Sequence, residues 1–321
     1  MKSTIRRNVV VLSGGVGAAK LLNGLVKVID PSEITAIVNV ADDTNLHGLH
    51  ISPDLDTVTY TLAGEIDPKK GWGLIDESWN AMDMISRYGG VDWFQLGDKD
   101  LGTHMYRTHR LLQGATLTAA TKEIARSLKV RVDILPVSND PIKTFVTTSD
   151  LGKIEFQEYF VRHKHNLRIT EVHFKGIENA TPGPKVIDEI TNASAIIIAP
   201  SNPIVSISPI LSVPGVKEAI QQKRDSTVAV SGIINGKALK GPADRMLLDL
   251  GHEVSPVGIA KIYKGLASKF VLDQTDTKHI AAIEKLGLKC IAAETVISDQ
   301  KKSAKLCSTI LSTFFPEVTK E

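Results

Sequence analysis

Short runs of β-branched and aliphatic residues alternate with helix-patterned segments along most of the chain. The apolar runs expected to form buried strands lie at residues 8–12, 34–38, 131–137, 195–199, 227–230, 269–272 and 289–292. Between them, apolar residues recur with helical spacing at 18–28, 117–128, 185–192, 215–222, 242–250, 259–267 and 279–286. This alternation is typical of βαβ units. It predicts a Rossmann-like α/β fold, with a doubly wound and mostly parallel sheet.

Two segments interrupt this alternation. Residues from about 60 to 115 show no clear buried strand and carry all three tryptophans, which favours a helical insertion. From about 143 to 175, polar and apolar residues alternate with period two, at 144–147 and again at 154–159, around an Asp150-Leu151-Gly152 turn. That period favours antiparallel strands. Because no Pro/Gly/Ser-rich linker flanks either insertion, we expect residues 1–321 to form a single domain.

The charge balance and the cysteine content narrow the function classes. The 321 residues include 38 Lys and Arg against 36 Asp and Glu, a net charge of +2, which argues against a nucleic-acid partner. Cys290 and Cys307 cannot build a disulfide framework, and the apolar run near the N-terminus is too short for a membrane span. We therefore expect a cytoplasmic protein without a membrane partner.

Small polar residues and glycines collect at the predicted strand ends, where open α/β sheets bind ligands. The first strand is followed by Gly14-Gly15-Val16-Gly17 and then Lys20, a loop whose backbone can approach a phosphate at a helix N-terminus. The alternative is a tight turn that needs glycine for its backbone angles alone. The later strand ends carry further candidate nucleotide contacts, Ser138, Asn139, Asp140, Ser201 and Asn202.

Four aspartates cluster after the second strand, at positions 42, 43, 54 and 56. Carboxylates that converge on a diphosphate suit Mg²⁺, which protein sites commonly hold through one or two carboxylates and the substrate phosphates. Asp54 follows a proline at a predicted helix start, so helix capping is its simpler explanation. Capping does not require Asp43 and Asp56, so we assign these two to metal binding; the choice between Asp42 and Asp43 stays open.

A charged segment follows at residues 97–104, and its helical spacing places Thr103, Arg107 and Arg110 near one face. One interpretation is a solvated loop with a surface ion-pair network. The other is a cation cluster that neutralises a polyanionic substrate.

Taken together, these motifs resemble a known family. The segments LSGGVGAAKLLNGL, VADDTNLHGLHISPDLDT, LGDKDLGTHMYRT, ILPVSNDPI, FQEYFVR, IIIAPSNPIVSISPIL and LKGPADRML occur in the order seen in 2-phospho-L-lactate transferases of the CofD type. The resemblance covers about residues 8–300. It implies transfer of a phospho-hydroxyacid group from a guanosine diphosphate ester to the ribityl hydroxyl of the deazaflavin Fo. GMP leaves, and the product belongs to coenzyme F-420 biosynthesis.

The resemblance also implies roles for single residues. The family positions that contact Fo match Asp56 and Lys99, which we predict to be catalytic: Asp56 orients or deprotonates the hydroxyl, and Lys99 stabilises the phosphoryl oxygens. Asp43, Thr103 and Arg107 are further candidates on the Fo side. Mg²⁺ is the expected cofactor, and a homodimer is the expected assembly.

Two other classes of protein remain open. A related group shares the glycine-loop fold and binds nucleotide sugars or dinucleotides as regulators; as a group it lacks the combination of SPDLDT and GDKD. An NAD-dependent dehydrogenase is a third interpretation, although the GxGxxG pattern is incomplete. The sequence leaves open whether the donor carries lactate, enolpyruvate or glycerate.

Overall fold

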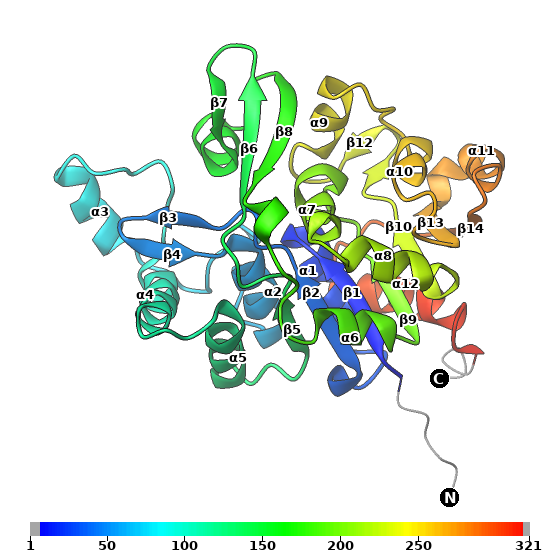
Figure 1. The fold of residues 1–321 in the computed structure, drawn as a ribbon, viewed down its shortest axis with the longest axis horizontal. Helices are drawn as coiled ribbons and strands as arrows, with labels where there is room; N and C mark the ends of the chain where they lie inside the picture. Colours follow the sequence, from blue (N-terminus) through cyan, green and yellow to red (C-terminus); the bar gives the residue numbers. More distant parts are fainter. Residues whose placement is uncertain (1–6, 317–321) are drawn as a thin grey trace, which may run out of the picture.

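A seven-stranded parallel sheet forms the centre of the molecule (Figure 1). The structure is a computed structural model and describes residues 7–316. In spatial order the strands are β14 (Lys289–Ala293), β13 (Lys269–Asp273), β10 (Thr227–Val230), β9 (Ala195–Ile198), β1 (Val9–Ser13), β2 (Ile34–Val38) and β5 (Asp133–Pro136). The predicted strands and the Rossmann-like fold class are thus confirmed. Strands β1, β2, β9 and β10 are buried along their whole length, which explains why their sequences are continuous apolar runs.

The strand order creates a switch point beside β1. The chain runs outward from β1 to β2 and β5, then returns to β9 on the other side of β1 and continues outward to β14 (Figure 1). Consecutive connections therefore leave β1 and β9 in opposite directions, which opens a crevice at their carboxyl ends. Strand β1 passes directly into α1 (Gly15–Leu25), so the glycine loop lies at this crevice.

Helices connect the sheet strands close to the predicted positions. They are α5 (Leu117–Ser127), α6 (Val186–Thr191), α8 (Val216–Gln222), α9 (Ala243–Asp249), α10 (Pro256–Ile262) and α11 (Ile280–Glu284). Two further helices, α7 (Ser208–Ser212) and α12 (Gln300–Ser312), lie outside the predicted segments. The helix predicted at 259–267 starts earlier, at Pro256, because the Ser255 hydroxyl accepts a hydrogen bond from the Gly258 amide and a proline occupies the first turn.

The first insertion is mainly helical, as predicted, and lies beyond the β2–β5 side of the sheet (Figure 1). It contains α2 (Pro53–Ala63), α3 (Asn80–Arg87) and α4 (Asp98–Leu112). A short hairpin that the sequence analysis missed precedes it, formed by β3 (Thr44–Leu46) and β4 (Leu49–Ile51). His47 and Gly48 form its turn with φ angles of 53° and 75°, the positive values that tight hairpin turns require.

The second insertion is a three-stranded antiparallel sheet of β6 (Lys143–Thr148), β7 (Gly152–Glu155) and β8 (Ile169–Lys175). The strand expected to continue to residue 159 instead ends at Glu155, and Glu158–Arg162 forms a π-helical turn. In a strand, Phe156 and Tyr159 would point to opposite faces. The helical turn places both against the protein interior and stacks the Phe160 ring on that of Phe156, with centroids 5.5 Å apart.

The helices of residues 7–316 include none with both the length and the apolar composition needed to cross a bilayer.

Candidate functional site

A cavity of about 650 Å³ lies at the switch point. The carboxyl ends of β1, β9 and β10 form one part of its wall. The two insertions, the segment after β10 that includes Lys240, and residues after β14 form the rest. The sheet contributes mainly small and charged residues, whereas the insertions contribute carboxylates and large aromatic side chains. The lining includes Gly14, Gly15, Val16, Gly17, Lys20, Asp42, Asp54, Asp56, Tyr60, Trp72, Trp93, Phe94, Asp100, His104, Phe156, Phe160, Ser201, Asn202 and Lys240.

The glycine loop closes tightly onto the end of β9. A Cβ atom on Gly17 would lie 2.3 Å from the carbonyl oxygen of Pro200, so only glycine fits there without moving backbone. The Ser201 hydroxyl donates to the Gly14 carbonyl at 2.7 Å and fixes the same junction. Helix α1 starts at Gly15, and the first-turn N–H groups of a helix have no partners within it. The loop therefore has the geometry of an anion site.

The Asp54 carboxylate is hydrogen-bonded to this loop and does not cap its own helix, α2. Its Oδ1 accepts from the Gly15 amide at 2.7 Å, and its Oδ2 accepts from the Asn39 side chain at 3.0 Å. Burial nevertheless raises the pKa of Asp54 to about 6, despite the hydrogen bonds from Asn39 and Gly15. The capping interpretation of Asp54 is therefore wrong for α2, since the carboxylate instead binds the N-terminus of α1.

Asp42 lies beside Asp54 on the cavity wall and carries an unsatisfied oxygen. Its side chain is 7% exposed, and no residue from 7 to 316 forms a hydrogen bond with Oδ1. Burial raises the pKa of Asp42 well above its usual value, and the negative charge of Asp54 raises it further. A cation bound between these carboxylates would relieve both effects.

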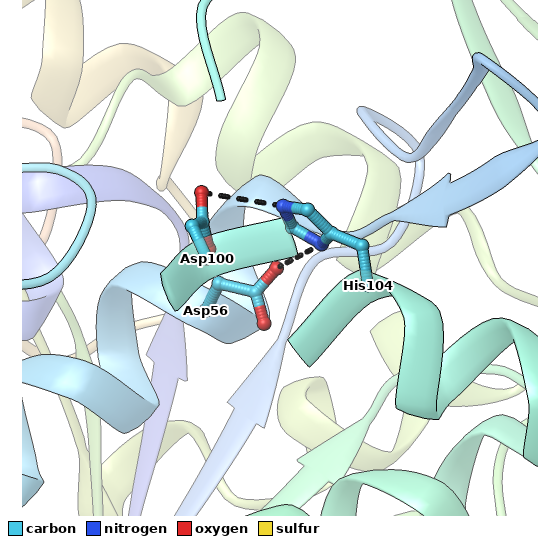
Figure 2. A group of neighbouring side chains, drawn as sticks. All are labelled: Asp56, Asp100 and His104. Carbon is cyan, nitrogen blue, oxygen red and sulfur yellow. Dashed lines mark ion pairs between the residues drawn. The ribbon is translucent and has the colours of Figure 1, made fainter. Parts of the chain in front are cut away.

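Asp56 is held in a buried network with side chains of α4 (Figure 2). The Arg107 guanidinium donates to both of its oxygens, with Nη1 3.1 Å from Oδ2 and Nη2 bonded to Oδ1. His104 lies between two carboxylates, with Nδ1 3.7 Å from Asp56 Oδ2 and Nε2 3.2 Å from Asp100 Oδ2. The Tyr60 hydroxyl donates to Asp100 Oδ1 at 2.7 Å.

This network lowers the pKa of Asp100. Burial alone would raise the pKa of Asp100, but the hydrogen bond and charge of His104 and the hydrogen bond from Tyr60 outweigh it and lower that pKa. The ligand atoms of Asp56, Asp100 and His104 lie within 4.8 Å of one another, so their types and spacing could hold a metal ion. The Arg107 guanidinium already donates to both oxygens of Asp56, however, and so neutralises its charge.

Several predicted residues lie outside the cavity lining. The Lys99 ammonium donates to the Ile75 carbonyl at 2.7 Å on the exposed start of α4. Thr103 lies near the Tyr60 hydroxyl and does not line the cavity. Asp43 faces away toward the β3–β4 hairpin, where its Oδ2 pairs with His50 at 2.9 Å and accepts from the Ser52 hydroxyl at 2.7 Å. The predicted metal pair of Asp43 and Asp56 therefore does not face the cavity together.

The segment after β5 has a structural role. Asn139 Oδ1 accepts from the Thr118 amide at the start of α5, and Asp140 Oδ2 accepts from the Thr181 amide at 2.7 Å. Ser138 donates to the Thr181 carbonyl at 2.7 Å. Strand β5 is separated from β1 by β2, so these three residues join loops at the sheet edge and do not line the cavity.

The structure also brings in residues that the sequence analysis did not select. Aromatic side chains from both insertions line the cavity: Trp72, Trp93, Phe94, Phe156 and Phe160. His104, Tyr60 and Lys240 lie on its wall as well. Helical spacing offered one usable signal, because His104 lies one turn from Asp100 and three residues from Arg107 on the same helix.

A glycine loop at the switch point of a parallel sheet, with acidic and aromatic walls, defines a Rossmann-like α/β protein with the geometry of an anion site. The family model described as "2-phospho-L-lactate transferase CofD" matches residues 9–314. The chain belongs to the CofD family, and its family identifies it as a transferase.

Named relatives support this membership. The phosphoenolpyruvate transferase of Nocardia farcinica is 40% identical over 288 residues, covering 86% of this chain and 87% of that protein. The 2-phospho-L-lactate transferase of Methanosarcina mazei is 35% identical over 305 residues, which cover 95% of this chain and 100% of that protein. A solved UPF0052-family protein from Bacillus halodurans shares the fold, with a TM-score of 0.62 and 21% identity. The match covers 96% of this chain and 100% of that chain.

Proposed function

We propose that this protein transfers a phospho-hydroxyacid group from a guanosine diphosphate ester to the ribityl hydroxyl of the deazaflavin Fo, releasing GMP, in coenzyme F-420 biosynthesis. The observation that carries the proposal is the mixture of residues that line the 650 Å³ cavity at the switch point. It joins a glycine loop with the geometry of an anion site to an aromatic surface, and carboxylates of α2 and α4 lie between the two. A diphosphate and a flat aromatic acceptor need these two kinds of surface in one cavity.

The glycine loop and the β9 end would bind the donor. The N–H groups of the first turn of α1 suit the diphosphate, and Ser201 and Asn202 offer polar atoms at the neighbouring strand end. The aromatic side chains of the insertions suit the deazaflavin, because flat rings gain dispersion energy by stacking. The two substrates would thereby meet at the carboxylates.

Magnesium fits Asp42 and Asp54 better than the predicted pair of Asp43 and Asp56. The buried Oδ1 of Asp42 has no hydrogen-bond partner among the described residues, and it lines the cavity beside the loop that Asp54 holds. When bound there, Mg²⁺ would offset the negative charge of the diphosphate and of the two carboxylates.

Asp56 would orient the attacking hydroxyl. Arg107 occupies one lone pair on each oxygen, and a carboxylate can accept further hydrogen bonds, so Asp56 can still accept from the Fo hydroxyl. In the transfer, the hydroxyl oxygen bonds to the phosphorus that carries the hydroxyacid. The bond from that phosphorus to the bridging oxygen breaks, and its electron pair leaves with GMP. The hydroxyl proton passes to Asp56 late, when the new bond has made it acidic, so a weakly basic carboxylate suffices.

The test is single-turnover transfer with purified protein, Mg²⁺, Fo and three donors, the lactyl, enolpyruvyl and glyceryl guanosine diphosphate esters. Mass spectrometry follows the deazaflavin product and GMP. We expect a Mg²⁺-dependent product from at least one donor, which also identifies the three-carbon acid. The relatives named above divide between phospholactate and phosphoenolpyruvate transferases, so both donors are needed. No product from any donor would refute the proposed reaction.

A regulator that binds nucleotide sugars or dinucleotides with the same fold is the competing function. It predicts that such ligands bind while Fo does not. Fluorescence titration with Fo separates the two functions without requiring turnover, and loss of Fo binding in a Trp93→Ala variant would place the acceptor against the aromatic wall.

A magnesium-dependent change in stability tests the metal site. At neutral pH, Mg²⁺ should raise the thermal midpoint of the wild type and leave that of Asp42→Asn nearly unchanged, because binding to the folded state alone stabilises it. Asp43→Asn is the matched control, since Asp43 faces the hairpin, and it should keep the response. An equal Mg²⁺ response in wild type and Asp42→Asn would refute the assignment.

A further inference from the structure

Two lysines from distant parts of the chain flank the glycine loop. Lys20 lies in α1, and its ammonium donates to the Ile297 carbonyl at 3.0 Å. Lys240 follows the hairpin of β11 (Ile233–Ile234) and β12 (Lys237–Ala238), which extends from the carboxyl end of β10. Both lysines line the cavity with Gly14–Gly17.

Gly71 shows where the Lys240 ammonium lies. A Cβ atom on Gly71 would be 3.2 Å from Lys240 Nζ and 3.7 Å from a methyl carbon of Val16, the residue inside the glycine loop. Gly71, Lys240 and Val16 therefore meet at one point, where the segment after α2 crosses the loop. This contact brings the ammonium over the start of α1, the place where a phosphate would bind.

These two positive charges face the cavity without acidic partners. Across residues 7–316, no carboxylate lies within ion-pair distance of Lys20 or Lys240, although Lys143, Lys185, Lys261 and Lys302 each have one. Burial lowers the pKa of Lys20, and the positive charge of Lys240 lowers it further. Two like charges at one wall repel each other. An anion bound between the two ammonium groups would attract both and so offset that repulsion.

Lys99, the lysine that the resemblance assigned to the phosphoryl oxygens, does not reach this position. Its ammonium is bonded to the Ile75 carbonyl outside the cavity lining, at the start of α4. We infer that Lys240, acting with Lys20, binds the terminal phosphate of a nucleoside diphosphate donor and neutralises the charge that gathers on the bridging oxygen as the nucleoside monophosphate leaves. This inference rests on the proposed function and gives a role to Lys240, which stands in the segment LKGPADRML but received no role from the sequence.

The experiment compares Lys240→Gln and Lys240→Arg with Lys237→Gln. Lys237 is an exposed lysine of the same hairpin that does not line the cavity, so it controls for loss of a surface charge. Calorimetry measures binding of GDP and GMP, and single-turnover assays measure transfer. Thermal unfolding verifies that each variant is folded, which the exposure of Lys240 leads us to expect.

For Lys240→Gln we expect GDP binding at least about 10-fold weaker, GMP binding weakened by less than about threefold, and transfer slowed about 30- to 100-fold. Lys240→Arg should recover most of the GDP affinity because it restores the charge, and Lys237→Gln should match the wild type. GDP binding within threefold of wild type in Lys240→Gln would overturn the inference, as would an equal loss for GDP and GMP.

The binding arm separates this inference from the proposed function. A wild type that binds GDP but transfers nothing would refute the reaction, while the GDP-to-GMP comparison would still decide the role of Lys240. A wild type that binds neither nucleotide would overturn both.

Discussion

Replacing Arg107 with methionine should destabilise the protein by about 3–5 kcal/mol, because it leaves a buried carboxylate without its counterion. Arg107 is 1% exposed and Asp56 is 5% exposed, and the guanidinium donates to both carboxylate oxygens. Methionine fills much of the space of the arginine stem, so the loss comes mainly from the missing charge and hydrogen bonds. His104, 3.7 Å from Asp56, is too far to replace them by a direct hydrogen bond.

Urea unfolding measures this effect as a shift in midpoint at constant slope. Asp56→Asn and the double variant complete a double-mutant cycle, and their coupling free energy should exceed about 2 kcal/mol, because the second substitution removes a charge that the first has already left unpaired. Transfer activity should fall in both single variants, since Arg107 fixes the carboxylate that we assign to the hydroxyl.

Arg110→Met is the matched control, one turn further along α4. Arg110 pairs with Glu123 of α5, but the two side chains are 30% and 38% exposed, so solvent screens their attraction. Its removal should cost no more than about 1 kcal/mol. If Arg107→Met unfolded within 1 kcal/mol of the wild type, or if both arginine variants lost the same stability, the electrostatic reasoning about the buried pair would be refuted.

Two further predictions concern the glycine loop. Gly17→Ala should destabilise the protein by about 1–3 kcal/mol and abolish GDP binding, because the new Cβ would overlap the Pro200 carbonyl. Gly102→Ala, on an open helix surface, is the control, and a thermal melt should show it to be neutral or slightly stabilising. Because the pKa of Asp54 is raised to about 6 in the folded protein, its contribution to stability is complete below about pH 4 and is lost as the pH rises through about 6. Between pH 4 and 7 the free energy of unfolding of the wild type should therefore fall by about 3 kcal/mol more than that of Asp54→Asn, as measured by urea unfolding. Equal pH dependence in the two proteins would contradict the assigned environment of Asp54.

The sheet could be predicted from sequence because its signal is local. Continuous apolar runs such as 195–198 must be buried on both faces wherever the rest of the chain goes, and parallel strands need that burial. The glycine loop was recognisable for the same reason, since Gly14–Gly17 directly follow a buried strand and open a helix. The order of the motifs along the chain then indicated the family, which the match over residues 9–314 established.

The partners of individual side chains were not predictable in this way. The sequence favoured helix capping for Asp54 and metal binding for Asp43 and Asp56. Packing instead joined Asp54 to the glycine loop, sent Asp43 to the hairpin and paired Asp56 with Arg107, 51 residues away along the chain. Lys99 and Lys240 show the same limit. Lys99 lies in the stronger motif, but its position on α4 turns its ammonium toward the Ile75 carbonyl and outside the cavity.

Sequence patterns alone thus predicted the strands of the central sheet, the parallel α/β class and the glycine loop, and they indicated the family. Tertiary packing placed the unsatisfied oxygen of Asp42 on the wall of the main cavity and turned Asp43 toward the hairpin. It also paired Asp56 with Arg107 and set Lys240 over the loop. The physical reason is that hydrophobic periodicity acts over neighbouring residues, whereas burial, charge pairing and pKa depend on elements that meet only when α2, α4 and the β11–β12 hairpin close around the same crevice.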